Sequence, residues 1–241
     1  MWNSDAAYDN FMGRFSSRLA PVFADFAGVK PGDRVLDVGA GTGMLTQELV
    51  RRGALPAAIE PAPAFAESLR RRFPDLDVRE GAAEQLPWED GSFDVALAQL
   101  VVAFMDDAPV GLAEMARVAN GRVAVCMWDY EHMELLRSVN RVRDRMGEAS
   151  PEPRRYRTAA EIQELLGPAA EVEPLDVEAG YESFEDYWTA LLGGAGPAGA
   201  WIESLDGEGR IIVRGELMRE LGNPQGAFTL SGRAWAGRTT G

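Results

Sequence analysis

The hydrophobic positions of this chain follow two periods that alternate through its first half. Runs of consecutive apolar residues, typical of buried strands, are each followed by a stretch in which apolar residues recur every three or four positions, as on one face of a helix. The expected strands span residues 34–38, 56–60, 76–80, 93–99 and 122–128. This alternation predicts an α/β fold with a doubly wound, mostly parallel sheet. Two later runs, 171–177 and 228–235, are predicted to be a sixth and a seventh strand.

Two segments are longer than the connections that such a sheet needs. Residues 129–158 follow the fifth expected strand, and residues 181–224 separate the sixth from the seventh. Ligands of open α/β sheets bind at the carboxyl ends of the strands, so we expect both insertions to cover a bound ligand. Neither has the length or composition of an independent domain. The chain is therefore predicted to form a single domain over residues 1–241.

The second insertion carries aromatic residues at helical spacing and a glycine-rich turn at 193–197. Helical spacing of this kind is typical of the core of a helix pair. A glycine-rich turn between aromatic helices also suits a lid that moves, and an aromatic surface suits a homodimer face. The sequence leaves these three interpretations open.

A glycine turn joins the first expected strand to the following helix. The segment 35–43, VLDVGAGTG, runs from apolar, β-friendly residues and an acid into three glycines at alternating positions. Glycine lets a ligand approach the backbone closely, and the helix N-terminus behind the turn offers free N–H donors. A dinucleotide fingerprint would need a third glycine where Met44 stands. A glycine turn in some other α/β protein is the alternative interpretation.

An acid closes the second expected strand. Glu60 lies seventeen residues past Gly43 and is followed by Pro61, close to where a doubly wound sheet places a ribose-binding carboxylate. A carboxylate that accepts both ribose hydroxyls makes charge-assisted hydrogen bonds. The alternative is a solvated acid at a strand end, but the register after the glycine turn favours the ribose role.

Further motifs follow in a fixed order along the chain. They are PGDR at 31–34, EGAAEQLPW at 80–88, DGSFDV at 90–95 and MARV at 115–118. With the glycine turn, they resemble class I S-adenosylmethionine-dependent methyltransferases, and most closely the ubiquinone/menaquinone-type and natural-product enzymes. The resemblance covers about residues 5–128. It implies a Rossmann-like, seven-stranded sheet whose seventh strand runs antiparallel between the fifth and the sixth.

The same resemblance implies S-adenosylmethionine as the cofactor and methyl transfer to a small molecule as the activity. The residues that it assigns to cofactor binding are Tyr8, Arg14, Asp37, Gly39, Gly41, Gly43, Met44, Glu60, Pro61, Ala82, Ala83 and Gln99. One position departs from the family. Ala82 replaces an acid that would accept the adenine amino group, so backbone contacts from Ala82 and Ala83 are expected to read the ring, with Leu86 or Trp88 over its face.

The N-terminal segment predicts a helix pair over residues 5–27, hinged near Pro21, with an apolar stripe along one face. The plain interpretation is a core-facing pair. In many small-molecule methyltransferases a segment like this one closes the cofactor pocket. The resemblance therefore implies that residues 1–30 form a cap that includes Tyr8, Met12 and Arg14, with Arg14 paired to the methionyl carboxylate.

No motif marks a general base, and we assign no catalytic residue from the sequence. The candidates at expected strand ends and in the insertions are Tyr130, His132, Tyr156 and Asp186. His132 suits proton transfer best by its chemistry. A solvated histidine on a helix turn is the alternative.

Composition narrows the class of partner. The net charge of −14 opposes binding of a polyanion, so no nucleic-acid partner is expected. One cysteine, Cys126, and one histidine exclude a disulfide within the chain and clustered cysteine or histidine metal sites. The longest apolar run, 95–105, is too short to span a bilayer, and residues 1–15 lack the pattern of a secretory signal. We therefore expect a cytoplasmic protein without a membrane partner.

Three other functions are compatible with parts of this pattern. A related enzyme could use S-adenosylmethionine for cyclisation or for transfer of a group other than methyl. A non-catalytic module could bind the same cofactor and act through a partner protein; Ala82 favours such divergence, whereas the intact glycine turn and Glu60 oppose it. A nicotinamide oxidoreductase is opposed by Met44.

Overall fold

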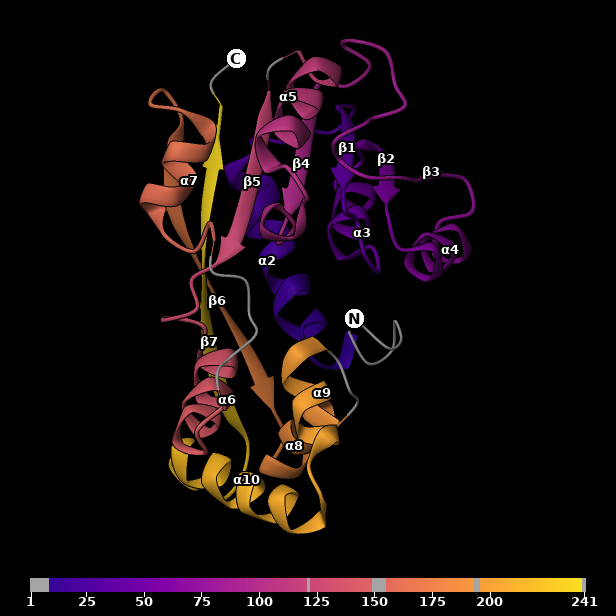
Figure 1. Ribbon diagram of the computed structural model, residues 1–241. Helices are drawn as coiled ribbons and strands as arrows, with labels where there is room; N and C mark the ends of the chain where they lie inside the picture. The colour runs from indigo at the N-terminus through magenta and orange to yellow at the C-terminus, as the bar shows by residue number, and fades with distance from the viewer. Residues whose placement is uncertain (1–8, 121, 149–154, 193–195, 240–241) are drawn as a thin grey trace. The chain divides into compact units, whose positions relative to one another are not determined.

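A computed structural model describes residues 9–120, 122–148, 155–192 and 196–239 (Figure 1). The chain divides into two compact units. The sheet unit comprises residues 19–129, 153–175 and 234–241, and the helical unit comprises residues 1–18, 130–152 and 176–233. Residues 1–18 of the expected N-terminal cap and most of both expected insertions therefore belong to the helical unit. Residues 31–128, the expected cofactor-binding core, belong to the sheet unit.

Seven strands form one sheet in the order β3-β2-β1-β4-β5-β7-β6. The strands are β1 (Arg34–Val38), β2 (Leu55–Glu60), β3 (Asp77–Glu80), β4 (Val95–Gln99), β5 (Val123–Trp128), β6 (Glu171–Tyr181) and β7 (Phe228–Arg238). Strands β1 to β5 pair in parallel, and β7 pairs antiparallel with β5. The predicted α/β class, strand positions and antiparallel seventh strand are confirmed. β1 lies between β2 and β4. The chain thus adds strands on one side of β1 and then on the other, and folds of this kind bind ligands at that switch point, which here lies beside the glycine turn.

Strands β6 and β7 are longer than their patterns predicted. Each spans 11 residues and passes from one unit into the other. The outer part of β6 alternates strictly between exposed and buried residues as far as Tyr181. That alternation is the signature of a half-buried strand, but acids and Gly180 at its exposed positions made the stretch look like the start of a loop.

Helices complete the sheet unit. They are α3 (Met44–Arg51), α4 (Pro63–Arg72), the 3-10 turn η1 (Val102–Phe104), α5 (Ala108–Val118) and α7 (Ala159–Leu166). The central strands are buried along their lengths, and β5 is buried at all six positions. This burial explains why Cys126 behaves as a small apolar residue, with a thiol pKa raised by desolvation.

The expected hinge near Pro21 is wrong. Helix α2 runs without interruption from Gly13 to Phe26 through the proline, and a turn at residues 11–12 comes before it. Leu19 and Phe23, on either side of Pro21, are fully buried, so packing of the apolar stripe outweighs the lost backbone hydrogen bond. The Pro21 carbonyl accepts a hydrogen bond from the Arg52 guanidinium at 2.7 Å.

The helical unit holds α6 (Glu134–Arg145), α8 (Phe184–Leu192), α9 (Gly196–Ser204) and α10 (Gly207–Glu220). Helices α6, α9 and α10 contact one another, and α8 packs on α9 (Figure 1). The aromatic residues of α8 and α9 are in the core of this unit: Phe184, Tyr187, Trp188 and Trp201 are all buried. This burial agrees with the helix-core interpretation of the second insertion, and a moving lid stays a prediction. Within the described ranges, no helix has the length and apolar character needed to cross a membrane.

Candidate functional site

The three glycines between β1 and α3 serve different purposes. Gly39, Gly41 and Gly43 all adopt positive φ angles, of 68°, 57° and 92°, which strain any other L-residue. A Cβ on Gly39 would lie 2.6 Å from Val101, and a Cβ on Gly43 would lie 2.8 Å from Leu69. A Cβ on Gly41 would meet nothing within 4 Å. Gly39 and Gly43 therefore allow close packing inside the protein, whereas Gly41 borders open space.

The carboxylate of Glu60 fastens this loop to the end of β2. One oxygen accepts the Gly41 N–H at 2.8 Å, and the other accepts the Ala62 N–H at 3.0 Å. Glu60 is buried, and this desolvation raises its pKa above the ordinary value, while both backbone hydrogen bonds act in the opposite direction. Each carboxylate oxygen can accept a further hydrogen bond. The loop therefore fixes the position of the Glu60 carboxylate and leaves it able to accept further hydrogen bonds.

Asp37, on the neighbouring strand β1, is more deeply buried than Glu60. The hydroxyl of Thr46, in the first turn of α3, donates to its carboxylate at 2.6 Å. Burial raises the pKa of Asp37 to about 7, and the neighbouring charge of Glu60 adds to the increase. Two carboxyl groups that influence each other thus sit at the ends of adjacent parallel strands.

Other expected cofactor residues surround the same edge of the sheet. Met44 begins α3 behind the loop, and Pro61 follows β2 directly. Ala82 and Ala83 follow β3, and Gln99 ends β4. All of these belong to the sheet unit, together with the three glycines, Asp37 and Glu60.

The structure adds three residues that the sequence did not single out. Besides Thr46, Arg72 at the end of α4 donates to the Thr42 carbonyl at 2.7 Å and so holds the glycine loop from the other side. Leu100, directly after β4, has a φ of 64°, a conformation that a leucine adopts only under constraint. None of these features has a local sequence signal, because each depends on contacts made after folding.

The loop expected at the adenine has internal contacts of its own. Leu86 is buried, and its N–H donates to Glu114 at 3.0 Å. Trp88 packs edge-on against Phe93, and its indole N–H donates to Asp77 at 3.1 Å. The Trp88 ring is therefore committed to the protein, and this favours Leu86 as the residue nearer to a bound ring.

The expected cap residues fall in the helical unit. Tyr8 lies outside the described residues. Arg14 makes a bidentate ion pair with Asp186, at 2.8 and 2.5 Å, and also donates to the Asn10 and Gly180 carbonyls. The carboxylate that Arg14 holds here is thus one of the protein's own. The same pair lowers the pKa of Asp186, which makes Asp186 a weaker general base than the sequence allowed.

Among the other base candidates, Tyr130 is buried, whereas His132 is exposed after β5. Tyr156 is half-buried and has a φ of 61°. The arrangement therefore brings together the parts of a nucleotide site, but it does not single out a base.

Comparison with known proteins identifies the sheet unit. A family model described as "Methyltransferase domain" matches residues 36–127. These residues form a methyltransferase domain. The match contains the glycine loop, Glu60, Ala82, Ala83 and Gln99, and S-adenosylmethionine is the cofactor of such a domain.

Curated relatives that match part of the chain are named methyltransferases. A demethylmenaquinone methyltransferase of Beutenbergia cavernae is 37% identical over 103 residues, which is 42% of this chain and 43% of the relative. An uncharacterized methyltransferase of Mycobacterium tuberculosis is 37% identical over 131 residues, covering 50% and 53% of the two chains. The chain thus spans about half the length of the curated relatives it matches.

Solved structures share the fold more widely. The MccD protein superposes with a TM-score of 0.56 at 16% identity, over 92% of this chain and 96% of that one. A SAM-dependent methyltransferase from Aquifex aeolicus gives 0.52 at 19% identity, over 69% and 86%. The [4+2]-cyclase SpnF gives 0.54 at 20% identity, over 92% and 81%. At these identities the likeness shows the fold alone.

The residues present fit the cofactor. Gly41 borders open space and has no side chain that would fill that space. The buried carboxylate of Glu60, which can accept further hydrogen bonds, is bonded to the Gly41 N–H. These are the features that an adenosyl ligand needs at the switch point of a doubly wound sheet.

Proposed function

We propose that this protein transfers the methyl group of S-adenosylmethionine to a small-molecule acceptor. The proposal depends on one observation within the methyltransferase domain: the Glu60 carboxylate accepts the N–H of Gly41, and Gly41 borders open space. Bound S-adenosylmethionine supplies an activated methyl group on a sulfonium. The protein has to bind it, aim it and exclude water, and such positioning can supply roughly 7–11 kcal/mol of the barrier.

Each group of residues has a part in that positioning. Glu60 accepts hydrogen bonds from the ribose hydroxyls, and Gly41 leaves room for the ligand to lie against the loop. Backbone groups of Ala82 and Ala83, with Leu86 beside them, contact the adenine. Asp37, Gly39, Gly43 and Met44 shape the loop and its helix. Pro61 and Gln99 border the site at the ends of β2 and β4.

A small acceptor is supported by the relatives named demethylmenaquinone methyltransferases. These relatives match only 41–42% of this chain, so the acceptor itself is not inherited from those names. We propose no general base, because Asp186 is held by Arg14 with a lowered pKa. The acceptors that fit this arrangement ionise near neutral pH or carry a free amine.

The fold by itself also accommodates another use of the cofactor. SpnF, which shares it, is named a cyclase. The distinction between methyl transfer, another reaction and a binding module without activity therefore has to come from the products.

The test is a calorimetric titration of the full chain with S-adenosylmethionine, S-adenosylhomocysteine and NADH. We expect micromolar binding of the two adenosyl ligands and none of NADH. A screen of phenols, amines and carboxylates with S-adenosylmethionine labelled in the methyl group follows. Labelled product is the expected result; binding without transfer to any acceptor class would favour the binding module, and NADH binding would overturn the proposal.

We also propose a cytoplasmic location and a homodimer formed through residues 181–224. Cell fractionation tests the first, and light scattering of the purified chain tests the second. A monomer at micromolar concentration would exclude the homodimer.

A further inference from the structure

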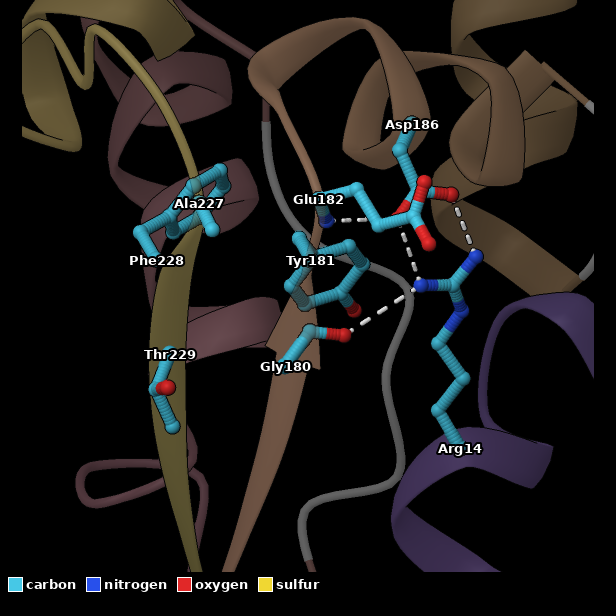
Figure 2. A pocket seen from close by; sticks show the side chains of 8 residues that line it. All are labelled: Arg14, Gly180, Tyr181, Glu182, Asp186, Ala227, Phe228 and Thr229. Atoms are coloured by element: carbon cyan, nitrogen blue, oxygen red, sulfur yellow. Dashed lines mark hydrogen bonds and ion pairs between the residues drawn. The ribbon is translucent and has the colours of Figure 1, made fainter.

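The helical unit holds a pocket of about 590 Å³ that the cofactor proposal does not use. It is bordered by the start of α2, the end of β6, the start of α8 and the first residues of β7. Its volume falls in the range of small-molecule sites. Figure 2 shows Arg14 reaching from α2 toward Asp186 on α8, with Tyr181 and Phe228 on the neighbouring strands.

The charges on the pocket wall do not cancel. Arg14 and Asp186 neutralise each other as a bidentate pair whose side chains are about a quarter exposed. Glu182 also lines the pocket, and its carboxylate makes no hydrogen bond or ion pair with any residue in the described ranges. The wall therefore carries one uncompensated negative charge. An anionic ligand would be repelled there, and a cation would be attracted.

Aromatic rings form the other side. Phe228 is half-buried and stacks on Tyr181, with ring centroids 5.4 Å apart and planes 19° apart. Tyr187 packs edge-on behind them. The Arg14 guanidinium already lies over the Tyr181 ring, 4.8 Å from its centroid. The half-buried Phe228 ring is therefore the aromatic group that a ligand carrying a cation and an apolar body would contact.

One buried polar atom lacks a partner at this wall. Tyr181 is 2% exposed, and its hydroxyl makes no hydrogen bond to any residue that the structure describes. Burying a hydroxyl without a hydrogen bond is unfavourable. The oxygen has less than 1 Å² of accessible surface, so a ligand in the pocket does not reach it.

We propose that this pocket binds a small protonated amine attached to an aromatic ring. The ammonium group donates to the Glu182 carboxylate, and the ring of the ligand packs against Phe228. The site is distinct from the glycine loop and does not depend on methyl transfer.

The test is an NMR titration of the full chain, without S-adenosylmethionine, with three probes of equal shape. These are the phenethylammonium ion, neutral 2-phenylethanol and anionic phenylacetate. We expect saturable binding of phenethylammonium with a Kd on the order of 1 mM, as suits a ligand of this size. The alcohol and the acid should bind at least about tenfold more weakly. Equal or tighter binding of phenylacetate, or no saturation by phenethylammonium, overturns the proposal.

One variant locates the site. Glu182→Gln should weaken phenethylammonium about fivefold by removing the charge. The matched control is Glu178→Gln, an exposed acid on β6, the strand that Glu182 follows, and it does not line the pocket. It removes the same charge from a protein whose net charge of −14 attracts any cation. If Glu178→Gln and Glu182→Gln weaken binding equally, the attraction is general and the pocket is not the site.

Discussion

The carboxylate of Glu60 accepts the backbone N–H of Gly41 at 2.8 Å, across the gap between the end of β2 and the loop after β1. This hydrogen bond joins the residue expected to bind ribose to the glycine that borders open space. A single buried acid thus both holds the loop and faces the site.

Replacing Glu60 with alanine should weaken S-adenosylmethionine and S-adenosylhomocysteine together, by about tenfold or more, because both ligands carry the same ribose. Calorimetry measures both affinities. Glu164→Ala is the control, since it removes an exposed acid from α7 in the same unit. Unchanged affinity in Glu60→Ala would place the ribose elsewhere.

Gly41→Val should abolish cofactor binding, because the side chain fills the space above the loop. The positive φ of Gly41 also costs about 1–2 kcal/mol of stability for any other L-residue. Gly32→Val separates the two effects, because Gly32 has a φ of 86° and a Cβ there also meets nothing within 4 Å. We expect similar losses of stability by urea unfolding in both variants, and loss of binding in Gly41→Val alone. Binding that survives in Gly41→Val contradicts the site.

Gly39→Ala should instead destabilise the fold more than Gly41→Ala. The new Cβ would lie 2.6 Å from a Val101 methyl, and overpacking of this kind typically costs about 1–3 kcal/mol beyond the strain of the positive φ. Urea unfolding measures the difference between the two variants. Adding Val101→Ala should recover part of the loss; a double variant no more stable than Gly39→Ala would mean that the clash is not the cause.

Asp37 should make the protein less stable as the pH rises from about 4 to about 7. Its pKa is raised from 3.8 to about 7 in the folded state, so the folded state binds more protons than the unfolded state in that window. Stability is highest below the unfolded pKa and falls as the pH approaches the folded value, with an upper bound of about 4 kcal/mol.

Urea unfolding at pH 5 and pH 8 tests this dependence. Asp37→Asn should lose much less stability between the two values than the unmodified protein. Thr46→Val removes the hydrogen bond that lowers the pKa of Asp37, so it should extend the loss of stability to higher pH. The same pH dependence in the unmodified protein and in Asp37→Asn would show that Asp37 is not responsible.

The Arg14–Asp186 ion pair should contribute measurably to stability. Its geometry is bidentate, and both side chains are about three-quarters buried. A double-mutant cycle with Arg14→Gln and Asp186→Asn is expected to give a coupling of about 1 kcal/mol. The more exposed pair between Arg214 of α10 and Glu185 of α8 is the control and should give a smaller value. A coupling near zero for Arg14–Asp186 would remove its structural role.

Local patterns were sufficient for most of the sheet. Strands β1 to β5 each carry a short apolar run, and their positions agree with the predicted ones to within two residues. The glycine segment marked the loop for the same reason, since positive φ angles leave few residue choices. The uninterrupted helix through Pro21 was mispredicted, because the packing of Leu19 and Phe23 overrides a local breaker signal.

Local sequence patterns did not predict which groups the polar side chains bind, because the partners lie on other elements of the fold. Arg14 was expected to meet a ligand carboxylate, but 172 positions along the chain Asp186 takes that place. Thr46 and Arg72 lie on helices with no motif of their own, yet they hold Asp37 and the glycine loop.

The sequence by itself determined the α/β class, the order of strands and helices and the cofactor family, because these depend on periodicity and on motifs within a few residues. Only the tertiary structure decided which glycine faces open space, which acid bonds to the loop and which charge in the helical unit stays uncompensated. Those properties arise from distances between side chains far apart in the chain, and no local pattern of residues records such distances.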